Sequence, residues 1–424
     1  MVALSLLLCL LALILLNVPI AFSIGITSLG YLLLNDINVA LLAQRATQGI
    51  YSYPFLALPL FVFAGALMEQ GGITRRLMRL ANAIIGHVSG GLAGVTVMGS
   101  SFFGTLCGSA IGDTAAVGSI MIPAMKAKRY SAGFAAALQG CCGLLASLLP
   151  PSLTMVVLGV TGNISIKSLM LAGILPGLLM ALALLVTAML VARRKGYGGS
   201  TRATRKELFI ALKESILPMM MPVIVLGGIF GGIVTVTEAA VLAVVYVFLL
   251  SKFVYKELSF LDLPRVALKT LHVSVPIQLI VAISALFAWI VTTEQISQHF
   301  LAMFVVLTED PMVFLLLISG FLLLAGTFME SNALIIILIP ILMPVVLQYG
   351  IDPVHFSVVF IVCLCIGAVT PPLGVTLMTA ARIAEVNVVH AYRALPPFLL
   401  AMGLMLIVIL FFPDIVTLLP RTLG

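Results

Sequence analysis

The sequence is short of charge. Lys, Arg, Asp and Glu make up 9% of its 424 residues, whereas soluble globular domains carry about a quarter. Hydrophobic residues make up 62%, and the mean hydropathy is +1.26. This composition excludes a soluble globule and predicts an all-α polytopic membrane protein. Apolar runs long enough to cross a hydrocarbon core of about 30 Å as helices lie near 169–192, 216–234, 273–293 and 395–412.

Cysteine and histidine are scarce as well, and neither shows ligand spacing. The six cysteines lie in apolar stretches, and the closest pairs, Cys141-Cys142 and Cys363-Leu364-Cys365, lack the two-residue spacer of redox and zinc motifs. We expect buried cysteines acting as small apolar side chains, and no bound cofactor. The apolar runs hold no Ser/His/Asp set or metal-ligand pair, which argues against a membrane-embedded enzyme.

Positive charge is concentrated in one loop. The predicted cytoplasmic linker, 193–215, contains seven bases and two acids. This excess of positive charge is what the positive-inside rule predicts for a cytoplasmic loop. It lies between spanning segments, so a nucleic-acid partner is not expected. A second linker, 252–269, is either an amphipathic segment with Phe253, Leu258 and Leu261 toward lipid or an ordinary surface loop.

The N-terminal segment is apolar but lacks the basic region of a signal peptide. Apolar character resumes directly after Asn17-Val18-Pro19. These features predict a retained, kinked membrane segment.

The sequence contains an internal repeat. Asp113 and Glu330, 217 residues apart, each precede an Ile-Pro dipeptide whose proline follows ten residues after the acid. The matched positions after Glu330 are separated from their partners by a few residues more than this. A small loop insertion in the second copy would explain the difference. The further matched features are Pro59 with Pro276, Pro150-Pro151 with Pro371-Pro372, and Pro176-Gly177 with Pro396-Pro397.

The two copies carry their charges on opposite sides. Bases follow the segments of the first copy: Arg75, Arg76 and Arg79, then Lys126, Lys128 and Arg129. The corresponding places of the second copy hold Glu294, Glu309 and Asp310, then Gln348 and Asp352. The positive-inside rule therefore predicts two inverted repeats, 1–192 and 216–424, an arrangement common in secondary transporters.

A glycine-rich stretch interrupts the first repeat. Seven glycines lie between Gly90 and Asp113. They indicate either a close helix-packing face or a re-entrant hairpin whose tip, 107–110, exposes backbone carbonyls to a watery cavity. Such carbonyls and the Ser109 hydroxyl are hard oxygen ligands of the kind that suits a small alkali cation.

Acids and diprolines complete two predicted sites. An acid in an apolar run tends to mark function, although Asp113 or Glu330 could instead cap a half-helix. Each diproline removes amide donors and releases carbonyls, although alone it could be a plain kink. The predicted ion and substrate residues are Gly108, Ser109, Asp113, Pro150, Ser152 and Thr154 in one half, and Thr327, Glu330, Ser331, Asn332, Thr370 and Pro371 in the other. Ion ligands and substrate contacts are not separable at this level.

These motifs resemble the large membrane subunit of the tripartite ATP-independent periplasmic (TRAP) transporters. The resemblance covers essentially the whole chain. It rests on the segments 108–118, 122–125 and 150–152 in the first half, and on 330–340, 350–353 and 366–374 in the second. Family members typically have Ser where this chain has Cys107. The tip of this chain therefore has one hydroxyl group fewer.

The resemblance implies an elevator-type secondary transporter with two re-entrant hairpins in a mobile domain. It implies sodium-driven uptake of an organic acid, such as a dicarboxylate, sialic acid or keto-sugar acid, delivered by a periplasmic binding protein. It also implies a four-helix small membrane subunit, expected here as a separate polypeptide. The complex is expected in the lipid bilayer of a bacterial or archaeal inner membrane. The sequence lacks the Gly-rich Lys-Ser/Thr loop of ATP-driven systems. A self-sufficient ion-coupled carboxylate carrier is the alternative.

Overall fold

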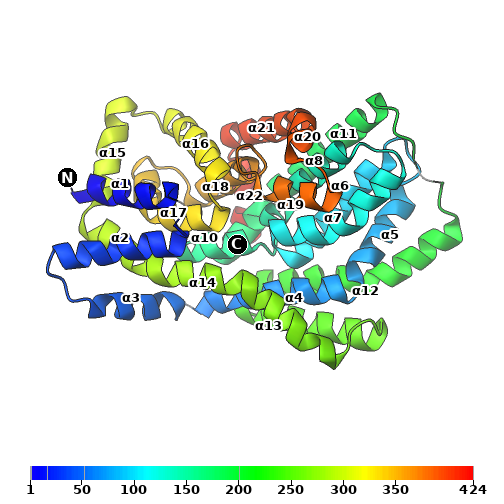
Figure 1. Ribbon diagram of the computed structural model, residues 1–424, viewed down its shortest axis with the longest axis horizontal. Coiled ribbons are helices and arrows are strands. Elements are labelled where there is room, and N and C mark those ends of the chain that lie inside the picture. The colour runs from blue at the N-terminus through cyan, green and yellow to red at the C-terminus, as the bar shows by residue number, and fades with distance from the viewer. Residues whose placement is uncertain (1, 17, 52, 200, 424) are drawn as a thin grey trace.

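The computed structural model describes residues 2–16, 18–51, 53–199 and 201–423. Its described residues form helices joined by short connections, with no strand among them (Figure 1). Seven helices are long and apolar enough to cross a membrane, or up to nine if each of two bent pairs is one span. The predicted all-α polytopic class is confirmed.

The first half runs to the end of α11. Its elements are α1 (Val2–Leu15), α2 (Ile20–Leu34), α3 (Ala40–Ile50), η1 (Tyr53–Leu56), α4 (Ala57–Gln70), α5 (Ile73–Ile85), α6 (Gly91–Cys107), α7 (Ala110–Ala127), α8 (Ala132–Gly143), α9 (Leu145–Leu148), α10 (Leu153–Thr161) and α11 (Ile166–Arg194).

The second half begins at α12. Its elements are α12 (Arg205–Phe230), α13 (Val236–Leu249), η2 (Leu250–Val254), η3 (Phe260–Asp262), α14 (Leu263–Thr293), α15 (Ile296–Leu307), α16 (Pro311–Phe328), α17 (Ser331–Gln348), α18 (Pro353–Gly367), α19 (Val375–Ala384), α20 (Val388–Ala394), α21 (Pro396–Phe411) and α22 (Asp414–Leu423).

The helices form two bodies. The long helices α4, α13 and α14 pack together along the lower side of Figure 1, and α2 and α3 pack on α14. The other body contains two helical hairpins, α6–α7 on the right of the figure and α16–α17 on its left, whose turns approach each other from opposite ends. Helices α8, α18 and α19 pack against these hairpins.

The linkers are shorter than the composition suggests. Helix α12 begins at Arg205 with a capping box, in which Thr204 and Glu207 bond to each other's backbone amides at 2.7 and 3.3 Å. The basic stretch after 204 is therefore part of a spanning helix. In the second linker, Phe253 and Leu261 are exposed, but Leu258 is buried, so the predicted lipid-facing stripe is wrong at that position.

The N-terminal segment forms two helices. Helices α1 and α2 are separate and pack against each other. Pro19 directly precedes α2 as its N-cap residue, where a missing amide donor costs nothing. Asn17, at the predicted kink, lies outside the described residues. Of the six cysteines, five are buried and Cys9 is exposed, so burial is confirmed for all but the first.

The helix caps fix the register of the repeat. Ser109 is the N-cap of α7 and Glu330 is the N-cap of α17, 221 residues apart. The same offset relates Pro123 to Pro344, Pro150 to Pro371 and Pro176 to Pro397. No loop insertion is needed from Ser109 onward, although Pro59 and Pro276 keep an offset of 217 residues. The match of Asp113 with Glu330 is wrong, because Asp113 lies one turn inside α7.

Close backbone contacts join each hairpin to a broken helix at matching places. A Cβ added at Gly104 of α6 would lie 3.0 Å from the Cα of Ala146, and one added at Gly367 of α18 would lie 2.6 Å from the Cα of Gly326 in α16. Glycine therefore serves as the packing residue at 104, 326 and 367.

We expect Gly367→Ala to lower stability by about 1–3 kcal/mol, since the new methyl group meets backbone atoms that cannot move aside. The measurement is the apparent melting temperature of the detergent-purified protein. Gly403→Ala, in the middle of α21 with no neighbour within 4 Å, is the matched control and should be neutral or slightly stabilising. Equal melting of the two variants would contradict the packing argument.

Candidate functional site

The first hairpin turns at a two-residue tip. Helix α6 ends at Cys107, and Gly108 adopts a left-handed conformation with φ +64°. A Cβ at this position would lie 2.6 Å from the carbonyl oxygen of Pro151, so only glycine fits. The Ser109 hydroxyl accepts the Gly112 amide at 3.3 Å and caps α7. The Ser109 hydroxyl is thus engaged as a cap, while its position still lines the cavities described below.

The second hairpin carries a carboxylate at its tip. Glu330 caps α17, accepting the Ala333 amide at 3.2 Å and the Asn332 side-chain amide at 2.8 Å. The Thr327 hydroxyl donates to the carbonyl of Leu324 at 2.7 Å, within its own helix. Of the two acids, Glu330 is therefore a cap, and Asp113 is not.

Three hydroxyl groups donate to backbone carbonyls close to the diproline turns. Ser152 caps α10 and donates to the carbonyl of Ser147 at 2.7 Å. Thr370 donates to the carbonyl of Ile366 at 2.6 Å, and Thr376 donates to that of Ala368 at 3.3 Å. Since a carbonyl oxygen has two lone pairs, those of Ser147 and Ala368 retain one for another partner, whereas that of Ile366 also accepts the Val369 amide at 3.4 Å.

Each tip is bonded to the diproline turn of its own half. The amide of Leu153, which follows Pro150-Pro151-Ser152, donates to the carbonyl of Gly108 at 3.2 Å. The amide of Leu373, which follows Pro371-Pro372, donates to the carbonyl of Thr327 at 3.3 Å. Each diproline turn therefore lies directly against the hairpin tip of its own half.

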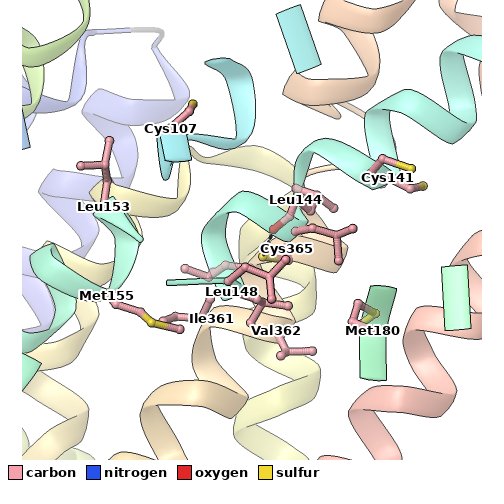
Figure 2. Packing of buried hydrophobic residues seen from close by; sticks show 14 of the residues in the cluster. Cys107, Cys141, Leu144, Leu148, Leu153, Met155, Met180, Ile361, Val362 and Cys365 are labelled. Carbon is pink, nitrogen blue, oxygen red and sulfur yellow. Dashed lines mark hydrogen bonds between the residues drawn. The ribbon is translucent and has the colours of Figure 1, made fainter. Parts of the chain in front are cut away.

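The two turns are packed together through their apolar neighbours. Figure 2 shows Leu144 and Leu148 beside Ile361, Val362 and Cys365 of α18. The Cys365 thiol lies 3.9 Å from the carbonyl oxygen of Leu144. This apolar contact holds the broken helices of the two halves at one depth.

Two adjoining cavities meet at the tips. A small one, of about 60 Å³, is lined from both hairpins and both broken helices. A larger one, of about 240 Å³, separates the tips from α4 and α14. Ser109, Ile111, Val273, Ile277, Glu330 and Asn332 line both cavities.

The small cavity brings half of the predicted residues together. Its lining includes Gly108, Ser109, Thr154, Glu330, Ser331 and Asn332. Five of the others do not line it but shape the neighbouring turns or hydrogen-bond to backbone carbonyls there. They are Pro150, Ser152, Thr327, Thr370 and Pro371. Sequence reasoning missed Ser147 and the α14 residues Val273 and Ile277, which line the cavity without any local motif.

Asp113 lies in a separate buried cluster behind the first tip. Its side chain is fully buried, as are those of Ser100 on α6 and Gln139 on α8. The Gln139 amide donates to the Ser100 hydroxyl at 3.3 Å and lies 3.5 Å from the carbonyl oxygen of Asp113. The Ser100 hydroxyl is also close to the Asp113 carboxyl group. Sequence reasoning missed Gln139, although a glutamine within the apolar run 132–143 was a visible signal.

The cluster has unmet acceptors. Within the described chain, both carboxylate oxygens of Asp113 and Oε1 of Gln139 have no hydrogen-bond partner of good geometry. An unpaired buried carboxylate costs several kcal/mol. These three oxygens, with the Ser100 hydroxyl as the donor nearest to Asp113, form a ligand set that suits a hard monovalent cation or a proton.

Comparison with known proteins decides the family. Residues 7–415 match the model for the DctM component of the tripartite ATP-independent periplasmic transporters. The chain belongs to the TRAP large-permease family. It is 37% identical to the sialic acid TRAP large permease SiaM of Vibrio cholerae, over 96% of this chain and 95% of that one. It is also 37% identical to the C4-dicarboxylate large permease DctM of Pseudomonas aeruginosa, over 95% and 94%.

Two further comparisons concern length and fold. The isethionate TRAP permease protein DctMQ of Oleidesulfovibrio alaskensis is 37% identical over 94% of this permease, which spans 63% of that longer chain. The crystal structure of the YdaH transporter of Alcanivorax borkumensis aligns over 85% of this permease and 86% of YdaH, with a TM-score of 0.57 and 13% identity. This likeness concerns the fold alone.

The cap at Glu330 can be separated from its charge. We expect Glu330→Ala to destabilise the purified permease by about 1 kcal/mol, because the first amides of α17 lose their acceptor. Glu330→Ser keeps a capping oxygen without the charge and should melt close to wild type. If Glu330→Ser is as unstable as Glu330→Ala in thermal melting, the charge at the helix dipole, rather than the cap, stabilises the tip.

Proposed function

We propose that this permease carries an organic anion into the cell, driven by an inward sodium gradient. The anion would be delivered by a periplasmic binding protein, and a separate small membrane subunit would complete the complex in a bacterial inner membrane. The names of the relatives, which specify sialic acid, C4-dicarboxylates and isethionate, support a carboxylate or sulfonate substrate. Ion drive fits the lack of a nucleotide-binding loop in the sequence.

The observation that carries the proposal is the buried carboxyl group of Asp113. Side-chain oxygens without donors, at the packing centre of α6, α7 and α8, are accounted for if a cation is part of the working cycle. Asp113, Ser100 and Gln139 would hold the first sodium ion together with nearby tip carbonyls. At the second tip, the orphan Oδ1 of Asn332 would contribute in the same way.

Helix ends supply the complementary charge for the substrate. The first turns of α7 and α17, together with Thr154 of α10 and Val375 and Thr376 of α19, line the small cavity. N-termini of half-helices present a positive dipole end and free amides to an anion. A carboxylate or sulfonate group would bind here once sodium has neutralised the neighbouring oxygens.

Coupling follows from the order of these charges. Without a cation, the carboxyl groups of Asp113 and Glu330 disfavour an incoming anion. With sodium bound, the tips are ordered and the anion gains affinity, so the two bind cooperatively. Each cation carried inward also gains about 2.3 kcal/mol per 100 mV of membrane potential.

Movement would follow an elevator path. The cavity of about 240 Å³ lies between the hairpin body and the α4–α14 body, where sliding changes access without opening the hairpins. Because the two hairpins enter from opposite ends, one would face the route to the outside and the other the route to the cytoplasm. A self-sufficient carrier with the same fold is the competing reading, and it differs in needing no binding protein.

We expect Asp113→Asn to reduce sodium-driven uptake by at least about tenfold, which corresponds to ~1.4 kcal/mol of lost affinity. Uptake is measured in proteoliposomes containing the permease and its small subunit, with and without the binding protein, using labelled sialic acid, succinate and isethionate. Asp352→Asn is the matched control, since Asp352 caps α18 through its oxygen at an exposed loop and asparagine caps equally well. Wild-type sodium dependence in Asp113→Asn would contradict the ion assignment.

A further inference from the structure

Two oppositely charged side chains lie at the far end of the larger cavity. Lys269 on α14 and Glu69 on α4 form an ion pair, with 2.7 Å between Nζ and Oε2. Both residues line the cavity that reaches Ser109 and Glu330 at the hairpin tips. Lys269 is the one basic residue in this lining. The pair has no part in the binding scheme described above.

The pair lies toward the cytoplasmic side. Helix α4 ends at Gln70, directly before the arginine-rich α5, and α14 begins after the linker whose Glu257 pairs with Arg75 and Arg76. By the positive-inside rule these bases face the cytoplasm. The cavity therefore leads from the tips toward the inner mouth of the protein.

The exposure of this ion pair favours a role in binding over a purely structural role. The side chains of Lys269 and Glu69 are 51% and 34% exposed, so the surrounding protein fixes neither of them in place. An ion pair with this exposure contributes little to stability. A lysine ammonium on a flexible stem can exchange one carboxylate partner for another at small cost.

We infer that Lys269 is an anion-binding residue of the inner cavity, which receives the carboxylate or sulfonate group of the substrate as it leaves the tips. Glu69 holds the ammonium group while the cavity lacks substrate and competes with the substrate for it. This inference rests on the proposed transport function and adds a release site to it. A cation placed beyond Glu330 provides an electrostatic path away from the tip carboxylate.

The test uses inhibition of uptake by substrate inside the vesicles. Internal succinate, sialic acid or isethionate should slow uptake by occupying the inner cavity. We expect Lys269→Gln to raise the internal concentration for half-inhibition about fivefold, and Lys269→Arg to leave it unchanged. Glu69→Gln should lower it, because the ammonium group loses its resident competitor. Arg265→Gln, one turn earlier on α14 and exposed, is the control and should match wild type.

The two single variants separate binding from structure. If the pair only joins α4 to α14, Lys269→Gln and Glu69→Gln must shift inhibition and melting temperature in the same direction, and the inference is overturned. A second measurement needs no transport: the three anions should raise the melting temperature of the purified wild type more than that of Lys269→Gln. If wild type takes up none of the three anions, the proposed function fails, and this melting comparison still decides the role of Lys269.

Discussion

Backbone groups inside an apolar medium must find partners, and this constraint shapes the centre of the molecule. Four helices stop there, and each interruption would leave amides and carbonyls exposed. One repeated contact satisfies part of this need: a backbone amide that follows each diproline donates to a carbonyl at the nearby hairpin tip. The amide of Leu153 donates to Gly108, and the amide of Leu373 donates to Thr327. The hydroxyls of Ser152 and Thr376 donate to the carbonyls of Ser147 and Ala368, which Pro151 and Pro372 leave without an amide donor. Unwound backbone is thereby kept at a depth where it can meet an ion or a substrate.

The two halves share this frame but differ in charge. At the tips, Ser109 and Glu330 occupy the same capping position, so the second tip carries a carboxylate that the first lacks. Behind the first tip, Asp113 supplies a buried carboxyl group, and the matching position 334 of the second half is leucine. Each hairpin thus contains one acid, buried behind the tip in one case and on the cavity wall in the other. Two cation sites built on this frame would differ in exposure and in their effect on a bound anion.

Local signals made the frame predictable. Gly108 permits a left-handed turn and the paired prolines interrupt a helix wherever they stand, so the first hairpin tip and the broken helices could be placed from the sequence. The register could not be placed in the same way, because matching Asp113 with Glu330 compared side-chain type, whereas capping position decides equivalence. Gln139 and Lys269 were missed because their importance depends on partners from other helices. Leu258 was assigned to lipid because a short apolar pattern does not reveal which face the protein covers.

The placement of charge also sets an order of events. An anion that reaches the small cavity first meets Glu330 on its wall, and the interaction is strong because the surroundings are poorly solvated. In the proposed cycle, a cation at the tips must therefore arrive before the anion or together with it. On the inner side the sequence of charges is reversed, since a substrate moving past Glu330 meets Lys269. If sodium is the coupling ion, as proposed, its loss to the cytoplasm would restore the repulsion at Glu330 while Lys269 still attracts the anion, so release of the ion and release of the substrate would favour each other.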